Sequence, residues 1–259
     1  MSVRGVQPGS AHKPFQMKQF TSLFALLLVF STGLFAQDAP SVREIGDAYI
    51  ENTGGEEAWL AIKSMKLTGK AAMQGMEFPM VMTTAEGNKQ HLKIDVQGQT
   101  IVQAYDGETA WQVMPFMGIT EPTPMGEDES EQMKSTKFLS EFINSEDRGF
   151  KLEPVEGKEV EGTPTYGVRV SHEDGYDVTY YFDQEYMIPI MTAVPVKAGP
   201  QKGAMMETYL SDYQEVENIV MPMFMEVKFN GQSVQKITLT AAELNPEVTD
   251  EMFALPKKE

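Results

Sequence analysis

The sequence contains no cysteine, so disulfide bonds, thiol catalysis and thiolate metal sites are excluded. No cysteine follows the apolar run near the N-terminus either, and the chain is therefore not expected to carry a lipid anchor of its own. Only three histidines and two tryptophans occur among the 259 residues. This scarcity of reactive side chains leaves few candidates for a catalytic or metal-binding centre.

Basic residues are also scarce, with 21 lysines and arginines against 38 aspartates and glutamates and a formal net charge of −17. Three of the 21, Arg4, Lys13 and Lys18, lie within residues 1–36, which hold no acidic residue. The remainder has 18 basic and 38 acidic residues, a net charge of −20. Such a charge opposes binding to nucleic acids and to anionic membrane surfaces. Nucleic acid is therefore not expected as a partner.

Residues 1–36 have the pattern of a secretory signal peptide. Lys13 and Lys18 precede an apolar run over residues 20–34, and Ala36 precedes a polar stretch. The run is short for a membrane span, and an uncleaved N-terminal anchor is the alternative. Met17 is a natural start, which would place residues 1–16 upstream of the true start. Cleavage after Ala36 would export residues 37–259 as a single domain, and export without disulfides fits the periplasm of a bacterial envelope.

The motifs of common enzyme classes are absent, because the sequence has no HExxH, no GxSxG and no glycine-rich phosphate loop. His91 lies on the polar face of an expected strand and His172 ends another, so both are expected to be exposed. Acidic pairs such as Glu56-Glu57 fit a solvated surface in a chain this acidic. The acidic residues 121–131 lack the spacing of a calcium loop. We therefore expect no enzyme activity, no cofactor and no metal site.

Two short helices are predicted at the start of the exported chain. Ser41 followed by Glu44 forms a capping box, which marks a helix N-terminus. Apolar residues then recur at helical spacing until Gly54-Gly55, which ends the helix. A second helix is predicted over residues 56–62. Both helices are amphipathic and are expected to pack on a sheet.

From Met65 onward apolar and polar residues alternate, as they do in β-strands. Glycine-containing turns separate the runs at about ten-residue spacing, which predicts an antiparallel sheet of about eleven strands and a mainly β fold. Two neighbouring runs place apolar side chains on one face of their strands. These side chains are Met76, Phe78, Met80 and Met82 in the first run, and Leu92, Ile94 and Val96 in the second.

Residues 221–239 give the clearest alternation in the chain. Asn230-Gly231 separates two alternating runs there, and this dipeptide is typical of a two-residue hairpin turn. The first run would present one apolar wall and one mixed face that can meet water. The apolar wall consists of Met221, Met223, Met225, Val227 and Phe229.

The alternation stops at residues 118–131, which are acidic and contain proline, so a loop is predicted there. Helical spacing returns over residues 129–146, and we expect this helix to close over the sheet as a lid. None of the three arginines after residue 36 is clearly placed to hold such a lid. The apolar face of the predicted lid helix consists of Phe138, Leu139, Phe142 and Ile143.

The chain contains 19 methionines, of which only Met1 and Met17 lie in residues 1–36. Methionine is flexible and suits a surface that accepts varied apolar ligands, whereas a rigid core favours branched aliphatic residues. We therefore favour the hypothesis that this methionine-rich face lines a ligand cavity, and ordinary core packing is the alternative. A copper(I) site at Met221, Met223 and Met225 is a third interpretation, but no histidine or cysteine lies nearby to complete it.

Several segments, in their order along the chain, resemble outer-membrane lipoprotein-sorting proteins of the LolA and RseB type. The resemblance covers residues 40–256 and rests on turn and packing motifs. These motifs are Gly54-Gly55 with residues 59–70, Gln97-Gly98-Gln99, Tyr105-Asp106-Gly107 with Trp111, Tyr180-Tyr181-Phe182-Asp183, Ile188-Pro189-Ile190, residues 209–213, Met221-Pro222 and Asn230-Gly231-Gln232.

The resemblance implies an open, strongly curved antiparallel half-barrel whose concave apolar face is covered by helices. In carriers with this fold the cavity holds acyl chains of a lipoprotein or lipid in transit through the periplasm, while other members act as sensors. The resemblance brings no set of catalytic residues.

We therefore expect a monomeric periplasmic carrier that holds acyl chains of lipids or lipoproteins for transfer to the outer membrane. The apolar faces named above would line the cavity, and the lid residues would close it. Envelope proteins that donate and accept the cargo are the expected partners. The alternative is an envelope sensor or scaffold of the same fold, with a filled core and no transported cargo.

Overall fold

The computed structural model describes residues 39–127, 130, 133, 134, 136–173, 175–197 and 202–257. The predicted signal peptide and the alternative start at Met17 lie outside these residues. The unit described below is Ala39–Glu259. Within its described residues, no helix is both long and apolar enough to cross a membrane.

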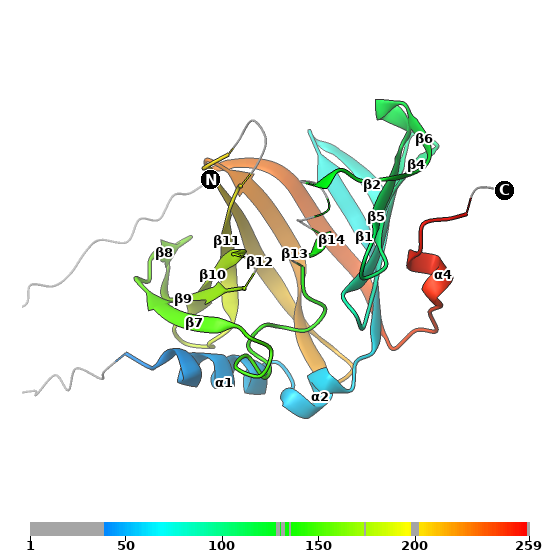
Figure 1. Cartoon of the computed structure of the whole chain (residues 1–259). Coiled ribbons are helices and arrows are strands. Elements are labelled where there is room, and N and C mark those ends of the chain that lie inside the picture. Colours follow the sequence, from blue (N-terminus) through cyan, green and yellow to red (C-terminus); the bar gives the residue numbers. More distant parts are fainter. Residues whose placement is uncertain are drawn as a thin grey trace, which may run out of the picture. The chain divides into compact units, whose positions relative to one another are not determined.

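The described residues form fourteen strands, which dominate the fold because alternating apolar residues continue through most of the chain (Figure 1). The first five are β1 (Ser64–Met73), β2 (Met76–Ala85), β3 (Lys89–Val96), β4 (Gln99–Tyr105) and β5 (Ala110–Met114). The next five are β6 (Ile119–Pro124), β7 (Lys151–Val155), β8 (Glu159–Val160), β9 (Thr163–Ser171) and β10 (Asp177–Asp183). The last four are β11 (Pro189–Pro195), β12 (Met205–Val216), β13 (Ile219–Phe229) and β14 (Gln232–Leu244).

The strands form an antiparallel sheet in the order β6-β5-β4-β3-β2-β1-β14-β13-β12-β11-β10-β9-β7, and β8 pairs with β9 beside this path. Most neighbours in the sheet are also neighbours in the chain, as the hairpin turns predicted. The pairing of β1 with β14 joins the two halves of the chain. The order ends at β6 and β7, so the curved sheet is open (Figure 1). The predicted open half-barrel is confirmed.

The number of strands is larger than the eleven or so predicted. Residues 118–131, predicted as a loop, contain β6, in which Ile119 pairs with Met114. β6 tolerates its two prolines because an end strand has one edge whose backbone groups need no partner. β8 has two residues, which is too short for an alternation to be visible in the sequence.

Asn230 and Gly231 form the predicted turn between β13 and β14. Their φ angles are 49° and 75°, in the left-handed region that a two-residue type I′ turn requires. Phe229 pairs with Gln232 directly across the turn. The predicted hairpin is confirmed.

The helices are short and few among the described residues. α1 (Val42–Asn52) begins at the predicted capping box, in which Ser41 and Glu44 bond each other reciprocally. α2 (Glu56–Leu60) follows it directly. A single turn of 3₁₀ helix, η1 (Pro115–Met117), follows β5, and α4 (Asp250–Phe253) lies near the C-terminus.

The junction between α1 and α2 is fixed to β13. The Val220 amide donates a hydrogen bond to the Thr53 carbonyl at 3.0 Å, and the buried Thr53 hydroxyl accepts one from Trp59 at 3.1 Å. Gly54 has a φ of 123°, and a Cβ there would lie 2.3 Å from the Asn218 carbonyl oxygen. This contact therefore requires glycine, which gives the Gly54-Gly55 motif a structural reason.

α4 packs on the face of the sheet opposite to α1 and α2. The Trp111 indole donates a hydrogen bond to the Phe253 carbonyl at 2.7 Å, and Phe253 is buried. His91 lies beside Trp111, with 6.2 Å between the ring centroids, and is only 8% exposed. The prediction that His91 is exposed is wrong, because the C-terminal segment covers a face that the alternation alone marks as polar.

Candidate functional site

The inner face of the sheet is the face that packs against α1, α2 and residues 136–149. Residues directly opposite each other on paired strands point to the same face, so the register defines its members. Met225 lies opposite Ile237 on β14. Ile237 lies opposite Ala71 on β1, and Ala71 lies opposite Phe78 on β2. The apolar wall predicted on β13 and the apolar faces predicted on β2 and β3 therefore belong to one continuous surface.

The twelve residues predicted to line a cavity differ in exposure. Met76, at the end of β2, is 49% exposed. Six are half-buried: Met82, Leu92, Val96, Met225, Val227 and Phe229. Five are buried in two clusters of core side chains: Phe78, Met80, Ile94, Met221 and Met223.

A cavity of about 390 Å³ lies on the inner face at β3, β4 and β5. Its volume falls within the range of about 300–1,000 Å³ that is typical of small-ligand sites. The described residues that line it include no ionisable side chain. They are five methionines (Met82, Met114, Met117, Met125 and Met133), three glutamines (Gln90, Gln103 and Gln112), Leu92 and Thr136.

Residues 136–149, which we call the lid segment, form bends and turns. The prediction of a lid helix over residues 129–146 is wrong for this part of the chain. The apolar side chains that suggested one helical face instead pack on different clusters. Phe138 packs against the cluster that contains Met223, whereas Phe142 and Ile143 belong to the cluster under α1. Tertiary packing has overridden the helical pattern.

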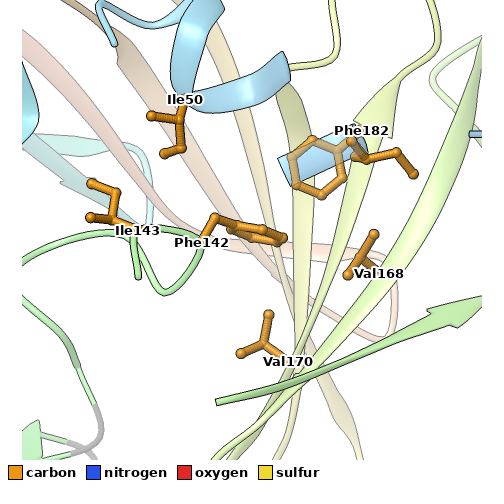
Figure 2. Packing of buried hydrophobic residues seen from close by; sticks show 7 residues of the cluster. Ile50, Phe142, Ile143, Val168, Val170 and Phe182 are labelled. Atoms are coloured by element: carbon orange, nitrogen blue, oxygen red, sulfur yellow. The ribbon is translucent and has the colours of Figure 1, made fainter. Parts of the chain in front are cut away.

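Phe142 and Ile143 anchor the lid segment in the core (Figure 2). The Phe142 ring packs edge-on against Tyr180 and Phe182, at centroid distances of 5.1 and 5.3 Å, and against Tyr49 at 5.8 Å. A Cβ on Gly46 would lie 2.9 Å from the Phe142 ring, so the glycine allows α1 to approach closely. These predicted lid residues are thus buried, and Leu139 is half-buried.

A larger cavity of about 700 Å³ lies between α1, the lid segment and β7. Phe142 and Ile143 line it, but none of the twelve predicted sheet residues does. Its wall would repel a carboxylate or a phosphate group, since most of the charged side chains that line it are acidic. The acidic side chains are Asp47, Glu51, Glu56, Glu146 and Asp147.

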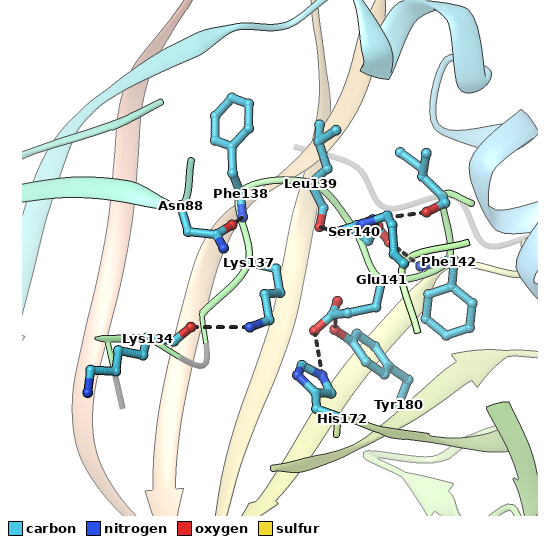
Figure 3. A network of polar contacts seen from close by, with 12 residues as sticks. Asn88, Lys134, Lys137, Phe138, Leu139, Ser140, Glu141, Phe142, His172 and Tyr180 are labelled. Atoms are coloured by element: carbon cyan, nitrogen blue, oxygen red, sulfur yellow. Dashed lines mark hydrogen bonds and ion pairs between the residues drawn. The ribbon is translucent and has the colours of Figure 1, made fainter. Parts of the chain in front are cut away.

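Glu141 fastens the lid segment to β9 and β10 (Figure 3). Its carboxylate accepts a hydrogen bond from the Tyr180 hydroxyl at 2.7 Å and lies 3.5 Å from Nε2 of His172. Burial raises the pKa of Glu141, but its interactions with His172 and Tyr180 lower it more, so the pKa lies below its usual value. Burial also raises the pKa of Tyr180, which keeps this hydroxyl a donor.

His172, the residue that follows β9, is 7% exposed, so the prediction that it is exposed is wrong. The Phe150 ring lies over it at 4.8 Å and the Tyr176 ring at 5.6 Å. Neither ring nitrogen of His172 has a hydrogen-bond partner within the described part of the chain. His172 is buried by the lid segment and by the residues that follow the lid segment, all of which are distant from His172 in sequence.

Arg148 holds the lid segment in its turn conformation. Its guanidinium donates hydrogen bonds to the carbonyl oxygens of Ser140 at 2.6 Å, Ile143 at 2.9 Å and Leu139 at 3.1 Å. Arginine suits this role because its planar group presents several donors in a fixed arrangement. The sequence could not assign this arginine, because only the turn brings the three carbonyl groups together.

The other end of the lid segment is tied to β3 and the turn before it. The Phe138 amide donates a hydrogen bond to the Asn88 side chain at 3.0 Å (Figure 3). Just before the lid segment, the Met133 carbonyl accepts a hydrogen bond from the Gln90 amide at 2.8 Å. The chain therefore crosses the inner face from β3 to β10, which is where a lid was predicted.

The described residues include no group of three or more His, Cys, Asp and Glu side chains that could hold a metal ion. Met221 and Met223, named in the copper interpretation, are packed with Ile219 and Leu239 in a core cluster.

Comparison with solved structures places the fold among known proteins. An outer membrane lipoprotein-sorting protein domain from Vibrio parahaemolyticus matches with a TM-score of 0.54 and 12% identity, over 82% of this chain and 95% of that chain. A LolA superfamily protein from Nitrosomonas europaea matches with a TM-score of 0.53 and 10% identity, over 83% and 98% of the two chains. The chain has a LolA-like fold. The predicted resemblance is confirmed at the level of the fold.

A DUF1329 family protein from Desulfovibrio piger shares the LolA-like fold, with a TM-score of 0.53 and 11% identity over 83% of this chain and 98% of that chain. No protein-family model matches the chain, and no curated protein sequence matches it either. At such low identity the likeness concerns the fold alone. The function therefore has to be argued from the inner face of this LolA-like sheet.

Of the residues predicted to line a cavity in the LolA-like sheet, only Met82 and Leu92 line the cavity of about 390 Å³. The sequence reasoning missed its glutamines because their positions in the strands were judged by apolar alternation alone. It also missed Met114 and Met117, which lie in a strand predicted over residues 110–117, and Met125 and Met133, which lie outside the predicted strands. The number of methionines between residues 114 and 133 is the signal that could have found them.

Proposed function

We propose that the chain is a carrier of the bacterial envelope that holds acyl chains of lipids or lipoproteins against the inner face of its LolA-like sheet. The observation that carries this proposal is the methionine-lined cavity of about 390 Å³, whose described lining residues include no charged side chain. It lies beside the half-buried apolar side chains of β2 and β3, and Met82 and Leu92 belong to both. An apolar ligand fits such a lining better than a charged one, because burying an unpaired charge is costly.

The inner face offers enough stabilisation for this purpose. Each buried CH₂ group contributes about 0.8 kcal/mol, so an acyl chain of about 16 carbons can be held without an ionic contact. Methionine side chains adapt to ligands of different shape because they are unbranched and flexible. The lid segment crosses this face and is fastened at Asn88 and Tyr180, so loading and release require it to move.

The proposal includes where the protein works and how it is exported. Residues 1–36 direct export, and residues 37–259 work as a single-domain monomer in the periplasm. Envelope proteins donate the cargo and accept it for the outer membrane. One relative of the same fold is named an outer membrane lipoprotein-sorting domain, which supports acylated cargo.

A sensor or scaffold function is the second candidate. The observation that favours it is the burial of Met80, Met221 and Met223, which are 4%, 8% and 5% exposed within packed clusters. A filled core of this kind needs no cargo. Under this alternative the chain would bind a partner protein in the envelope and take up no lipid.

The test is native mass spectrometry of the full chain, expressed for export and purified from the periplasm of a bacterial host. The carrier proposal expects discrete added masses that extract into organic solvent as phospholipid or acylated peptide. Uptake of a fluorescent probe whose acyl chain ends in an uncharged ester should accompany them. A clean protein mass together with no uptake of the probe would refute the carrier and favour the scaffold.

A single substitution can distinguish a ligand cavity from a packed core. Met82→Asp places a charge in the cavity and should abolish probe uptake while the protein stays folded, since Met82 is half-buried. Met252→Asp is the control, because Met252 is 40% exposed on α4 at the opposite face. Equal probe uptake by the two variants would argue against a ligand at this cavity.

A further inference from the structure

The cavity of about 390 Å³ differs from the rest of the protein in its charge. The chain carries 38 acidic and 21 basic residues, yet the described lining of this cavity includes none of them. A free carboxylate or a phosphate placed there would have no cationic partner among these residues. Burying such a group unpaired is strongly unfavourable, so the lining selects against charged ligand groups.

The lining is nevertheless not wholly apolar. Three glutamines lie on the inner face of three successive strands, β3, β4 and β5. Gln103 on β4 is directly opposite Gln112 on β5. On β3 the residue opposite Gln103 is Leu92, and Gln90, two residues before Leu92, is opposite Tyr105. Gln103 and Gln112 therefore face each other, and Gln90 is the diagonal neighbour of Gln103 on the same face, which is otherwise rich in methionine. We call these three residues the glutamine row.

The three amides are not equally engaged by the protein. Gln90 donates to the Met133 carbonyl at 2.8 Å, and Gln90 and Gln112 are buried at 8% and 6% exposure. Gln103, between them, is half-buried, and no side-chain hydrogen bond joins it to another described residue. Its amide can therefore offer both a donor and an acceptor to a group inside the cavity.

We propose that this glutamine row is a subsite for the uncharged ester or amide linkage of an acylated ligand, with Gln103 as the residue that determines specificity. The inference rests on the proposed function and narrows its cargo. Ligands whose acyl chain ends in an ester or amide are bound, and free fatty acids, which end in a carboxylate, are disfavoured. The methionines of the cavity contact the first carbons of the chain.

The test compares two ligands with the same acyl chain, monopalmitoyl glycerol and sodium palmitate, at pH 7.5 and below their aggregation concentrations. Displacement of a bound fluorescent acyl probe from delipidated protein gives both affinities. The neutral ester should bind on the order of tenfold more tightly, since the carboxylate loses its hydration without gaining a cation.

Gln103→Leu removes the amide and keeps a side chain of similar size. It should weaken binding of monopalmitoyl glycerol on the order of tenfold, the loss expected for one hydrogen bond, and should not weaken palmitate. Gln99→Leu is the matched control, because Gln99 lies on the same strand, is exposed and does not line the cavity. Circular dichroism of both variants shows whether the fold is kept.

The outcomes separate the two proposals. Equal affinity of the wild-type protein for ester and carboxylate overturns the glutamine subsite and leaves the carrier proposal standing, and this comparison needs no variant. Equal effects of Gln103→Leu and Gln99→Leu on ester binding also overturn it. Failure of the acyl probe and of both ligands to bind the delipidated protein refutes the carrier proposal itself.

Discussion

Replacing Phe142 with alanine tests whether the lid segment is part of the core. Phe142 is 8% exposed and contacts the rings of Tyr180 and Phe182 on β10 and of Tyr49 on α1. Its ring therefore contacts both of these elements from the lid segment. Phe142→Ala therefore removes packing from the sheet, from the helix and from the lid at once.

The expected loss follows from the burial of the ring. A buried phenylalanine replaced by alanine typically costs about 3–5 kcal/mol, which includes the cavity left behind. For a protein of this size each kcal/mol lowers Tm by about 2–4 °C, so the expected decrease is about 6–20 °C. If the lid segment can detach while the sheet stays folded, the global loss is smaller and the lid becomes accessible to proteases.

Two assays are needed because of these two outcomes. Urea unfolding gives the free energy of unfolding, and limited proteolysis followed by mass spectrometry gives the cleavage rate within residues 136–149. Phe116→Ala is the control, because Phe116 is 55% exposed and its loss should stay within about 0.5 kcal/mol. The reasoning is refuted if Phe142→Ala resembles Phe116→Ala in both assays.

Two further predictions concern the same region. Because the folded pKa of Glu141 is lowered, its carboxylate stabilises the native state above the unfolded pKa of about 4.3, and this contribution disappears as the pH falls through the folded pKa. Glu141→Gln should therefore be less stable than the wild type at pH 7, with a difference that shrinks below about pH 4 in urea titrations; a difference independent of pH would contradict this. Gly54→Ala should destabilise by about 1–3 kcal/mol more than Gly75→Ala, because of these two glycines only Gly54 would bring a Cβ against a backbone oxygen. Equal losses of stability in thermal unfolding would argue against that contact.

Local signals predicted much of the fold. The capping box at Ser41, the turn at Asn230-Gly231 and the alternation in β2, β3 and β13 are all present as expected. These features depend on residues close together in the sequence. A helix start needs one side chain to reach its own first turn, and a hairpin turn needs two residues that accept positive φ.

The candidate site was only partly predictable. The shared face of β2, β3 and β13 follows from a period of two once the strands are paired. The cavity, by contrast, also takes Met125 and Met133 from outside the strands, and no local rule brings these residues to β3. The glutamine row was missed for a similar reason, because three polar residues on successive strands become neighbours only through the register.

The sequence by itself determined that this chain forms an antiparallel meander with one apolar face, because alternation and turn chemistry act over a few residues. Only the tertiary structure decided the conformation of the lid segment. There the spacing of Phe138 and Phe142 suggested a helix, but each ring gains more by packing in a separate cluster. The buried positions of Glu141 and His172 were decided in the same way, since their burial depends on contacts between segments about 30 residues apart, which local pattern cannot specify.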